Sequence, residues 1–221
     1  MSERVINICF HGVGHPRRGQ EPGEDLYWVG VDQYHRILDE VAGWPGVRLS
    51  FDDGNVTDVE HGLPGLVERG LTATFFPVAG RIDEAGSLSA DQIRELVAAD
   101  MRIGTHGMRH VPWRGLDAAE RRAELVDARA RIAEVAGRPV QEAALPLGRY
   151  DRRLLAELRR LGYTRVYSSD RRKTMESAWF QPRFSVTRED DPASLRARAL
   201  RDPGPAQRAK LVAVGFVKRV R

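Results

Sequence analysis

The sequence has a single cysteine, Cys9, among its 221 residues. One cysteine excludes an internal disulfide framework and any zinc site built from several thiolates. No hydrophobic run approaches the roughly 20 residues of a transmembrane helix. The apolar stretch at 5–10 is too short for the core of a secretory signal, so a cytoplasmic location is the default expectation. Internal repeats and low-complexity segments are also lacking, and the length suits one globular domain.

Most of the chain lacks an excess of positive charge, although the net charge is +4. Residues 192–221 hold eight Lys or Arg and one Asp, which gives +7 there and leaves −3 for residues 1–191. Because a nucleic-acid-binding domain carries its basic surface on the fold itself, we expect no nucleic-acid partner. We expect a domain over 1–190 and a basic helical extension over 191–221 that packs on it. Weak contact of this extension with a membrane surface is the alternative.

Strand-like and helix-like segments alternate along the chain. Helix starts are marked by capping-box spacing at Ser89 and Asp117. Single βα units in series predict one domain with a parallel sheet, either open or closed into a barrel. The expected strands are 5–10, 47–51, 72–77, 101–105, 142–146, 163–168 and 183–187, and the expected helices are 31–42, 56–69, 88–99, 117–136 and 151–161.

Polar and titratable residues follow the ends of these strands. Because the loops after the C-terminal strand ends of a βα barrel form its active-site face, these residues are expected to gather on one rim. The set comprises His11, Asp52, Asp53, His106, His110, Pro146, Gly148 and Asp170.

Two carboxylates and two imidazoles on this rim suggest a metal site. His106 and His110 are four residues apart, a spacing that lets both imidazoles reach one cation. Asp52 and Asp53 are adjacent; Asp-Gly is also a common turn dipeptide, but one carboxylate can bind the metal while the other accepts a proton from a metal-activated water. Nitrogen and oxygen ligands are typical of catalytic zinc, and cobalt or nickel would also be accepted.

These residues resemble the motifs of polysaccharide deacetylases of the NodB-homology, carbohydrate esterase 4 type. Ser50-Phe51-Asp52-Asp53-Gly54 is similar to Thr-Phe-Asp-Asp-Gly, and 106–110 is similar to His-Ser/Thr-x-x-His. The resemblance covers roughly residues 5–187. It implies a distorted seven-stranded (β/α) barrel, with Asp52 as general base. It also implies that Asp53, His106 and His110 bind a divalent metal, usually zinc.

The sequence departs from the family pattern at two positions, the arginine beside the catalytic aspartate and the histidine that acts as general acid. The third motif keeps Pro-x-Gly but has Ala144 where the family has an arginine that steadies the catalytic aspartate, and no histidine follows His110 to act as general acid. Phe10-His11 resembles the early aromatic-His pair of exopolysaccharide N-deacetylases with a rearranged motif order. We therefore expect His11 to be the acid and Arg183 to supply the guanidinium, with Asp170 nearby.

The expected activity is hydrolysis of an N-acyl amide, foremost N-acetyl, on an amino sugar or glycan precursor. Pro146, Gly148, Tyr150 and Trp113 are expected to contact the sugar, although ordinary packing explains the two aromatic residues equally well. Two alternatives remain open. One is a carbohydrate-binding or regulatory protein on the same fold with weak or lost catalysis, and the other is an amide hydrolase acting on something other than a sugar.

Overall fold

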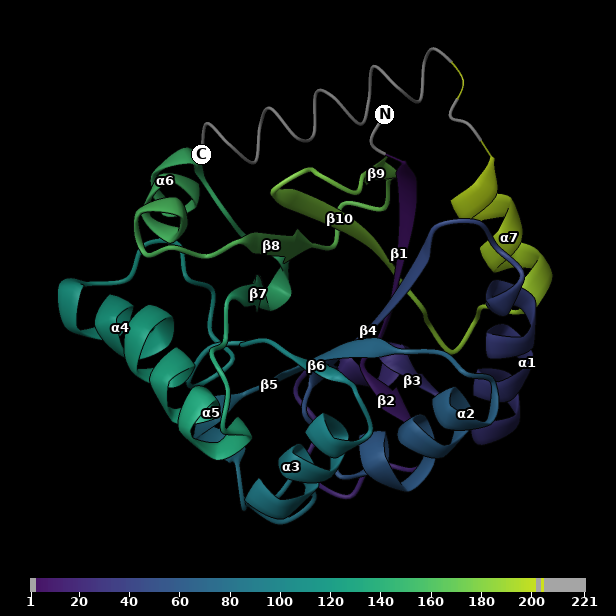
Figure 1. Ribbon diagram of the computed structural model, residues 1–221, viewed down its shortest axis with the longest axis horizontal. Coiled ribbons are helices and arrows are strands. Elements are labelled where there is room, and N and C mark those ends of the chain that lie inside the picture. Colours follow the sequence, from purple (N-terminus) through teal and green to yellow (C-terminus); the bar gives the residue numbers. More distant parts are fainter. Residues whose placement is uncertain (1–2, 202–203, 205–221) are drawn as a thin grey trace.

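The computed structural model describes residues 3–201 and 204, and its centre is a barrel of parallel strands with the helices outside it (Figure 1). Neighbouring strands follow the order β6-β5-β4-β1-β10-β8-β7. A parallel bridge between Thr105 and Ala143 joins the two ends of this sheet. The barrel strands are β1 (Arg4–Phe10), β4 (Val47–Asp53), β5 (Ala73–Pro77), β6 (Arg102–Ile103), β7 (Glu142–Ala144), β8 (Arg165–Ser168) and β10 (Phe180–Ser185). The predicted seven-stranded single-domain (β/α) barrel is confirmed.

The helices other than α4, which has no buried residue, each bury one face. In α1, Tyr34, Ile37, Leu38 and Val41 are buried, which is the i, i+3, i+4, i+7 spacing of an amphipathic helix. The predicted capping boxes at Ser89 and Asp117 both form. The helices are α1 (Val31–Ala42), α2 (Leu63–Glu68), α3 (Ala90–Ala98), α4 (Ala118–Arg122), α5 (Ala128–Ala136), α6 (Arg152–Arg160) and α7 (Pro192–Leu200).

Two of the helices expected from the sequence contain a π-helical turn. The turn Asp58–Gly62 precedes α2, and the turn Ala123–Asp127 lies between α4 and α5. Each turn holds a fully buried carboxylate, Asp58 or Glu124. Asp58 accepts the backbone N–H of Asn55 at 3.1 Å, and Glu124 accepts that of Met108 at 2.7 Å. The two π turns therefore anchor the two loops that carry the aspartates and the histidines.

The seventh barrel strand begins at Phe180, three residues before the predicted start at 183. Residues 180–182 pair with β8, and residues 183–185 pair with β1. Pro182 within this stretch argues against a strand when the sequence is read alone. Three further short strands were not expected: β2 (Gly12–Val13), β3 (Trp28–Val29) and β9 (Thr174–Met175).

The parallel pairing of β2 with β3 closes the loop after β1 into a compact segment, residues 14–27, which we call the strap. It contains a short 3-10 helix, Glu24–Tyr27. The ion pair between Arg18 and Glu24 lies within the strap, and the ion pair from Arg81 to Glu21 and the hydrogen bond from Arg18 to Asn55 hold the strap over the barrel rim.

Part of the predicted C-terminal extension, 191–221, lies within the described residues. Helix α7 packs on α1, and Leu195 and Ala199 join the main hydrophobic core. Residues 202–203 and 205–221, which include the segment expected to pack or to contact a membrane, lie outside the described part of the chain. Among residues 3–201 and 204, no helix combines the length and apolar character needed to cross a bilayer.

Candidate active site

A cleft opens at the C-terminal ends of the barrel strands, where the sequence predicted the active-site face. One wall consists of the strap, and the opposite wall consists of the loops after β7 and β8. The lining residues are His11, Glu21, Pro22, Gly23, Glu24, Tyr27, Asp52, Asp53, His106, His110, Leu145, Leu147, Gly148, Ser169, Arg183 and Ser185.

Asp52 and Asp53 both reach the cleft because the chain turns at the end of β4. Adjacent residues on an extended strand point to opposite faces, but Asp53 has a φ of 74° and Gly54 a φ of 72°. A left-handed φ is uncommon for a residue with a side chain, and such strain often accompanies functional sites. A Cβ at Gly54 would lie 2.9 Å from the backbone of Pro77. The glycine therefore allows the turn against β5.

Three side chains converge closely enough to hold a metal ion: Asp53, His106 and His110. Nε2 of His106 lies 3.6 Å, and Nε2 of His110 3.4 Å, from Oδ1 of Asp53. Oδ1 of Asp53 is buried and has no hydrogen-bond partner among the described residues. An ionised carboxylate oxygen left without a partner is costly, and a cation between these three atoms would satisfy it.

The spacing of these groups and the tautomer of His106 fit a tetrahedral divalent metal. Ligand atoms 2.0–2.2 Å from a tetrahedral ion lie roughly 3.3–3.6 Å from one another, which is the separation seen here. Nδ1 of His106 lies 2.9 Å from the carbonyl oxygen of Ala144, and this oxygen can only accept, so Nδ1 carries the proton and Nε2 is free to ligate. Burial lowers the pKa of His106 to about 4, which keeps the imidazole neutral. The residues present therefore suit a divalent metal.

Gly107 stands where the family motif has Ser or Thr. Its φ is 84°, and a Cβ at this position would collide with the Glu124 carboxylate and the Trp113 indole. Glu124 holds the same loop from below by accepting the backbone N–H of Met108 and, at 3.1 Å, the guanidinium of Arg109. The Glu124 carboxylate thus lies where a side chain at position 107 would be, which explains why this chain has glycine there.

Arg183 makes a buried, two-pronged ion pair with Asp52. Nη1 donates to Oδ1 at 2.6 Å and Nη2 donates to Oδ2 at 2.5 Å, with both side chains about 2–3% exposed. Burial by itself would raise the pKa of Asp52, but the charge and hydrogen bonds of the Arg183 guanidinium, with contributions from His106 and His11, together hold that pKa well below its usual range. The guanidinium predicted to replace the arginine missing at Ala144 therefore contacts Asp52, from β10.

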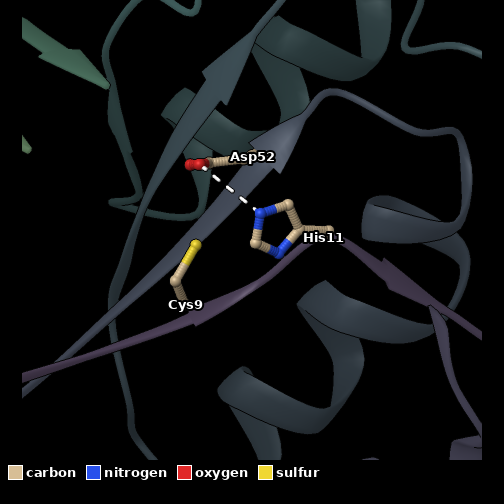
Figure 2. A group of neighbouring side chains, drawn as sticks. All are labelled: Cys9, His11 and Asp52. Atoms are coloured by element: carbon tan, nitrogen blue, oxygen red, sulfur yellow. Dashed lines mark ion pairs between the residues drawn. The ribbon is translucent and has the colours of Figure 1, made fainter. Parts of the chain in front are cut away.

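His11 lies at the end of β1 and points toward Asp52 (Figure 2), with Nε2 3.9 Å from Oδ2. It faces the ring of Tyr27 in the strap, with the ring centres 4.8 Å apart. Cys9 lies next to this pair and is fully buried. Burial raises the pKa of the Cys9 thiol well above its usual value, which favours the neutral thiol.

The remaining residues expected at the site divide into two groups. Gly148 lines the cleft together with Leu147 and with Ser169 of the loop after β8. Trp113 and Tyr150 are only 2% and 1% exposed and do not line it, so neither ring is placed to stack on a sugar. The Trp113 indole donates to Glu124 at 3.3 Å.

Asp170 and Pro146 also stay behind the cleft surface. Asp170 accepts hydrogen bonds from the hydroxyls of Tyr150, at 2.7 Å, and Ser168, at 2.9 Å. Pro146 is buried and begins the turn that presents Leu147 and Gly148. These residues support the loops after β7 and β8, while their neighbours form the wall.

Most of the strap residues that line the cleft have no signal in the sequence. Glu21, Glu24 and Tyr27 lie in a stretch without helical or strand periodicity, after the first strand. Because loops after barrel strands face the active site, this stretch as a whole is expected near the site, but that rule does not show which of its residues line the cleft. Glu21 matters most here, because its Oε2 lies 2.8 Å from Nδ1 of His110.

A parallel βα barrel with ionisable side chains gathered at the C-terminal strand ends has the architecture of barrel enzymes. A family model described as polysaccharide deacetylase matches residues 39–166, and the chain belongs to that family. The resemblance seen in the sequence motifs is confirmed.

One relative and two solved structures show the extent of the similarity. The chain is 25% identical over 117 residues to "Putative polysaccharide deacetylase YxkH" of Bacillus subtilis, a match covering 53% of this chain and 42% of that protein. The chain thus spans less than half of that relative's length. Two solved structures share the fold. Deacetylase PplD of Streptococcus pyogenes, solved in complex with acetate, has a TM-score of 0.75 and 17% sequence identity, and the match covers 92% of this chain and 100% of that one. IcaB of Ammonifex degensii has a TM-score of 0.71 and 22% identity, and the match covers 89% of this chain and 97% of that one.

Proposed function

We propose that this protein hydrolyses an N-acyl amide, foremost an N-acetyl group, on an amino sugar or glycan precursor, with a divalent metal, foremost zinc. The observation that carries the proposal is the separation of two carboxylates within one cleft. Asp53 faces two imidazole Nε2 atoms with an unpartnered oxygen. Asp52 is held by Arg183 instead. Membership of the polysaccharide deacetylase family supports the choice of a carbohydrate N-acyl substrate.

The chain's own residues supply the proton transfers. When bound to Asp53, His106 and His110, the metal would polarise the amide carbonyl and favour ionisation of the attacking water. Asp52, kept as a carboxylate by Arg183, accepts the proton from that water. His11, whose Nε2 lies 3.9 Å from Oδ2 of Asp52, donates a proton to the departing amine as the C–N bond breaks. Return of the proton from Asp52 to His11, across the same 3.9 Å, restores both groups, so that the amide and one water give acetate and the protonated amino sugar.

The cleft walls favour a substrate with both apolar and polar faces. Leu145, Leu147 and Tyr27 offer apolar surface, and Glu24, Ser169 and Ser185 offer polar groups. A sugar ring carrying an acyl amide has the same mixture, with C–H faces and hydroxyl edges. The substrate enters between the strap and the loops after β7 and β8.

The test combines metal analysis with product release. Purified protein is loaded with Zn²⁺, its metal content is measured, and acetate is assayed after incubation with N-acetylglucosamine, its oligomers and N-acetylated precursor sugars. We expect release by the wild type, a loss of at least about 10²-fold in Asp52→Asn with metal retained, and loss of metal in Asp53→Asn. Release that persists in Asp52→Asn would contradict the assigned base. Metal binding with no release from any substrate would favour a carbohydrate-binding or regulatory protein.

A further inference from the structure

We propose that Glu21 of the strap is a positioning residue for the metal site, which it supports by holding His110 in the tautomer and orientation that ligation needs. The proposal rests on the proposed function only in taking Asp53, His106 and His110 as the metal ligands. Glu21 lies 89 residues before His110 in the sequence, and only the fold brings their side chains together.

The hydrogen bond fixes which nitrogen of His110 can bind a metal. Oε2 of Glu21 lies 2.8 Å from Nδ1, and an ionised carboxylate can only accept, so Nδ1 carries the proton. The lone pair is then on Nε2, which is the atom 3.4 Å from Oδ1 of Asp53. A carboxylate bonded to the outer nitrogen of a histidine ligand also raises the basicity of the ligating nitrogen.

His110 needs such support more than His106 does. Nδ1 of His106 donates to the backbone carbonyl of Ala144, at the end of a barrel strand, and that contact belongs to the frame of the fold. His110 lies in a loop and has a φ of 59°, a left-handed conformation that is unfavourable for a histidine without local support. A side chain from another segment provides the hydrogen bond that the barrel backbone provides for His106.

Glu21 is itself held from two directions. Its carboxylate forms an ion pair with Arg81. Arg81 ends the 3-10 turn after β5, and that turn is bonded to the histidine loop, since the N–H of Gly80 donates to the carbonyl oxygen of Met108 at 2.9 Å. Separately, Arg18 fixes the strap by bonding to Asn55 at 2.8 Å. The chain of contacts from Arg81 through Glu21 to His110 is therefore anchored at both ends.

The test is the affinity of the full chain for Zn²⁺, measured by competition with a chromophoric chelator. Removing a comparable outer-shell partner typically weakens metal affinity by 10- to 100-fold. We expect a loss of about that size in Glu21→Ala and a smaller loss in Glu21→Gln, whose amide oxygen still accepts from Nδ1 but carries no charge. Co²⁺-loaded protein should show an altered visible absorption spectrum in Glu21→Ala, because the geometry at His110 changes.

Two controls separate the contact from other effects. Glu84→Ala removes an exposed carboxylate near Arg81 and should leave Zn²⁺ affinity unchanged. Glu24→Gln weakens the Arg18–Glu24 ion pair inside the strap, and with it the packing of the strap, without removing a contact to His110. If Glu24→Gln lowers the affinity as much as Glu21→Ala does, the position of the strap matters and not the Glu21 contact, and the proposal is overturned.

The outcomes also separate this proposal from the proposed function. Wild-type affinity in both Glu21 variants overturns the positioning role, even if acetate is released normally. A 10- to 100-fold loss supports that role even if no substrate is found, in which case only the proposed function fails. A wild-type protein that binds no Zn²⁺ or Co²⁺ would refute both.

Discussion

Replacing Arg183 by methionine isolates the buried ion pair with Asp52. Methionine has a similar length and keeps apolar contact with Phe76 and Tyr167, whose rings lie 5.4 and 5.6 Å from the guanidinium carbon. The substitution removes both hydrogen bonds to Asp52 and the bond to Ser50 Oγ at 3.1 Å. Asp52 is then a fully buried carboxylate without its main partner.

The expected loss of stability is large. Removing one partner of a buried ion pair typically costs about 3–5 kcal/mol, because the other charge is left without compensation. Two imidazoles remain near Asp52, with Nε2 of His11 at 3.9 Å and Nε2 of His106 at 3.8 Å, so we expect the lower end, about 3 kcal/mol. In a chain of this length that corresponds to a fall of roughly 6–12 °C in Tm.

A second substitution tests the cause of this loss. Asp52→Asn in the Arg183→Met background removes the uncompensated charge, so the double variant should regain about 2 kcal/mol relative to Arg183→Met alone. Urea unfolding at neutral pH with a chelator present gives the free energies of unfolding without a contribution from metal. Arg94→Met serves as the control, because Arg94 pairs with Asp91 at an exposed position and should cost less than about 1 kcal/mol.

Two results would refute the reasoning. The first is an Arg183→Met variant that unfolds within about 1 kcal/mol of the wild type, since the pair would then not be compensating a buried charge. The second is a double variant no more stable than Arg183→Met, since the loss would then come from packing and not from the charge on Asp52.

Two further predictions concern other residues near the site. His11→Ala should reduce turnover by about 10²–10⁴-fold with unchanged metal content, because His11 faces Asp52 and not the metal-ligand set; near-normal acetate release would rule out the acid role. Glu124→Ala should lower the free energy of unfolding by about 2–6 kcal/mol, because the Met108 N–H and the buried Trp113 indole lose their acceptor at about 1–3 kcal/mol each. Urea unfolding measures this loss, and a wild-type unfolding curve would show that these groups find other partners.

Local patterns determined much of the fold. The alternation of apolar strand segments with amphipathic helices predicted a parallel sheet, since βα units in series have few other solutions. The capping boxes at Ser89 and Asp117 were visible because they depend on residues three apart. The π turns at 58–62 and 123–127 were not visible, because one extra residue in a helical turn changes the hydrophobic spacing very little.

The sequence alone singled out Asp52, Asp53, His106 and His110 as the candidate metal and base residues, because each of the two motifs is a short run of neighbouring residues. It also suggested Arg183, but on the ground that an arginine was missing at Ala144. Only the fold showed that Arg183 reaches Asp52, 131 residues earlier, since β10 lies beside β1, which in turn pairs with β4.

Tertiary structure alone decided which rim residues form the surface of the cleft. Trp113 and Tyr150 follow strands as the site residues do, yet both rings are buried, because the loops that carry them turn inward against Glu124 and Asp170. Glu21 lies in an irregular stretch, but it contacts His110 because the strap folds back over the rim. Such contacts depend on the paths of long loops in space, and residue spacing along the chain does not encode those paths in any local pattern.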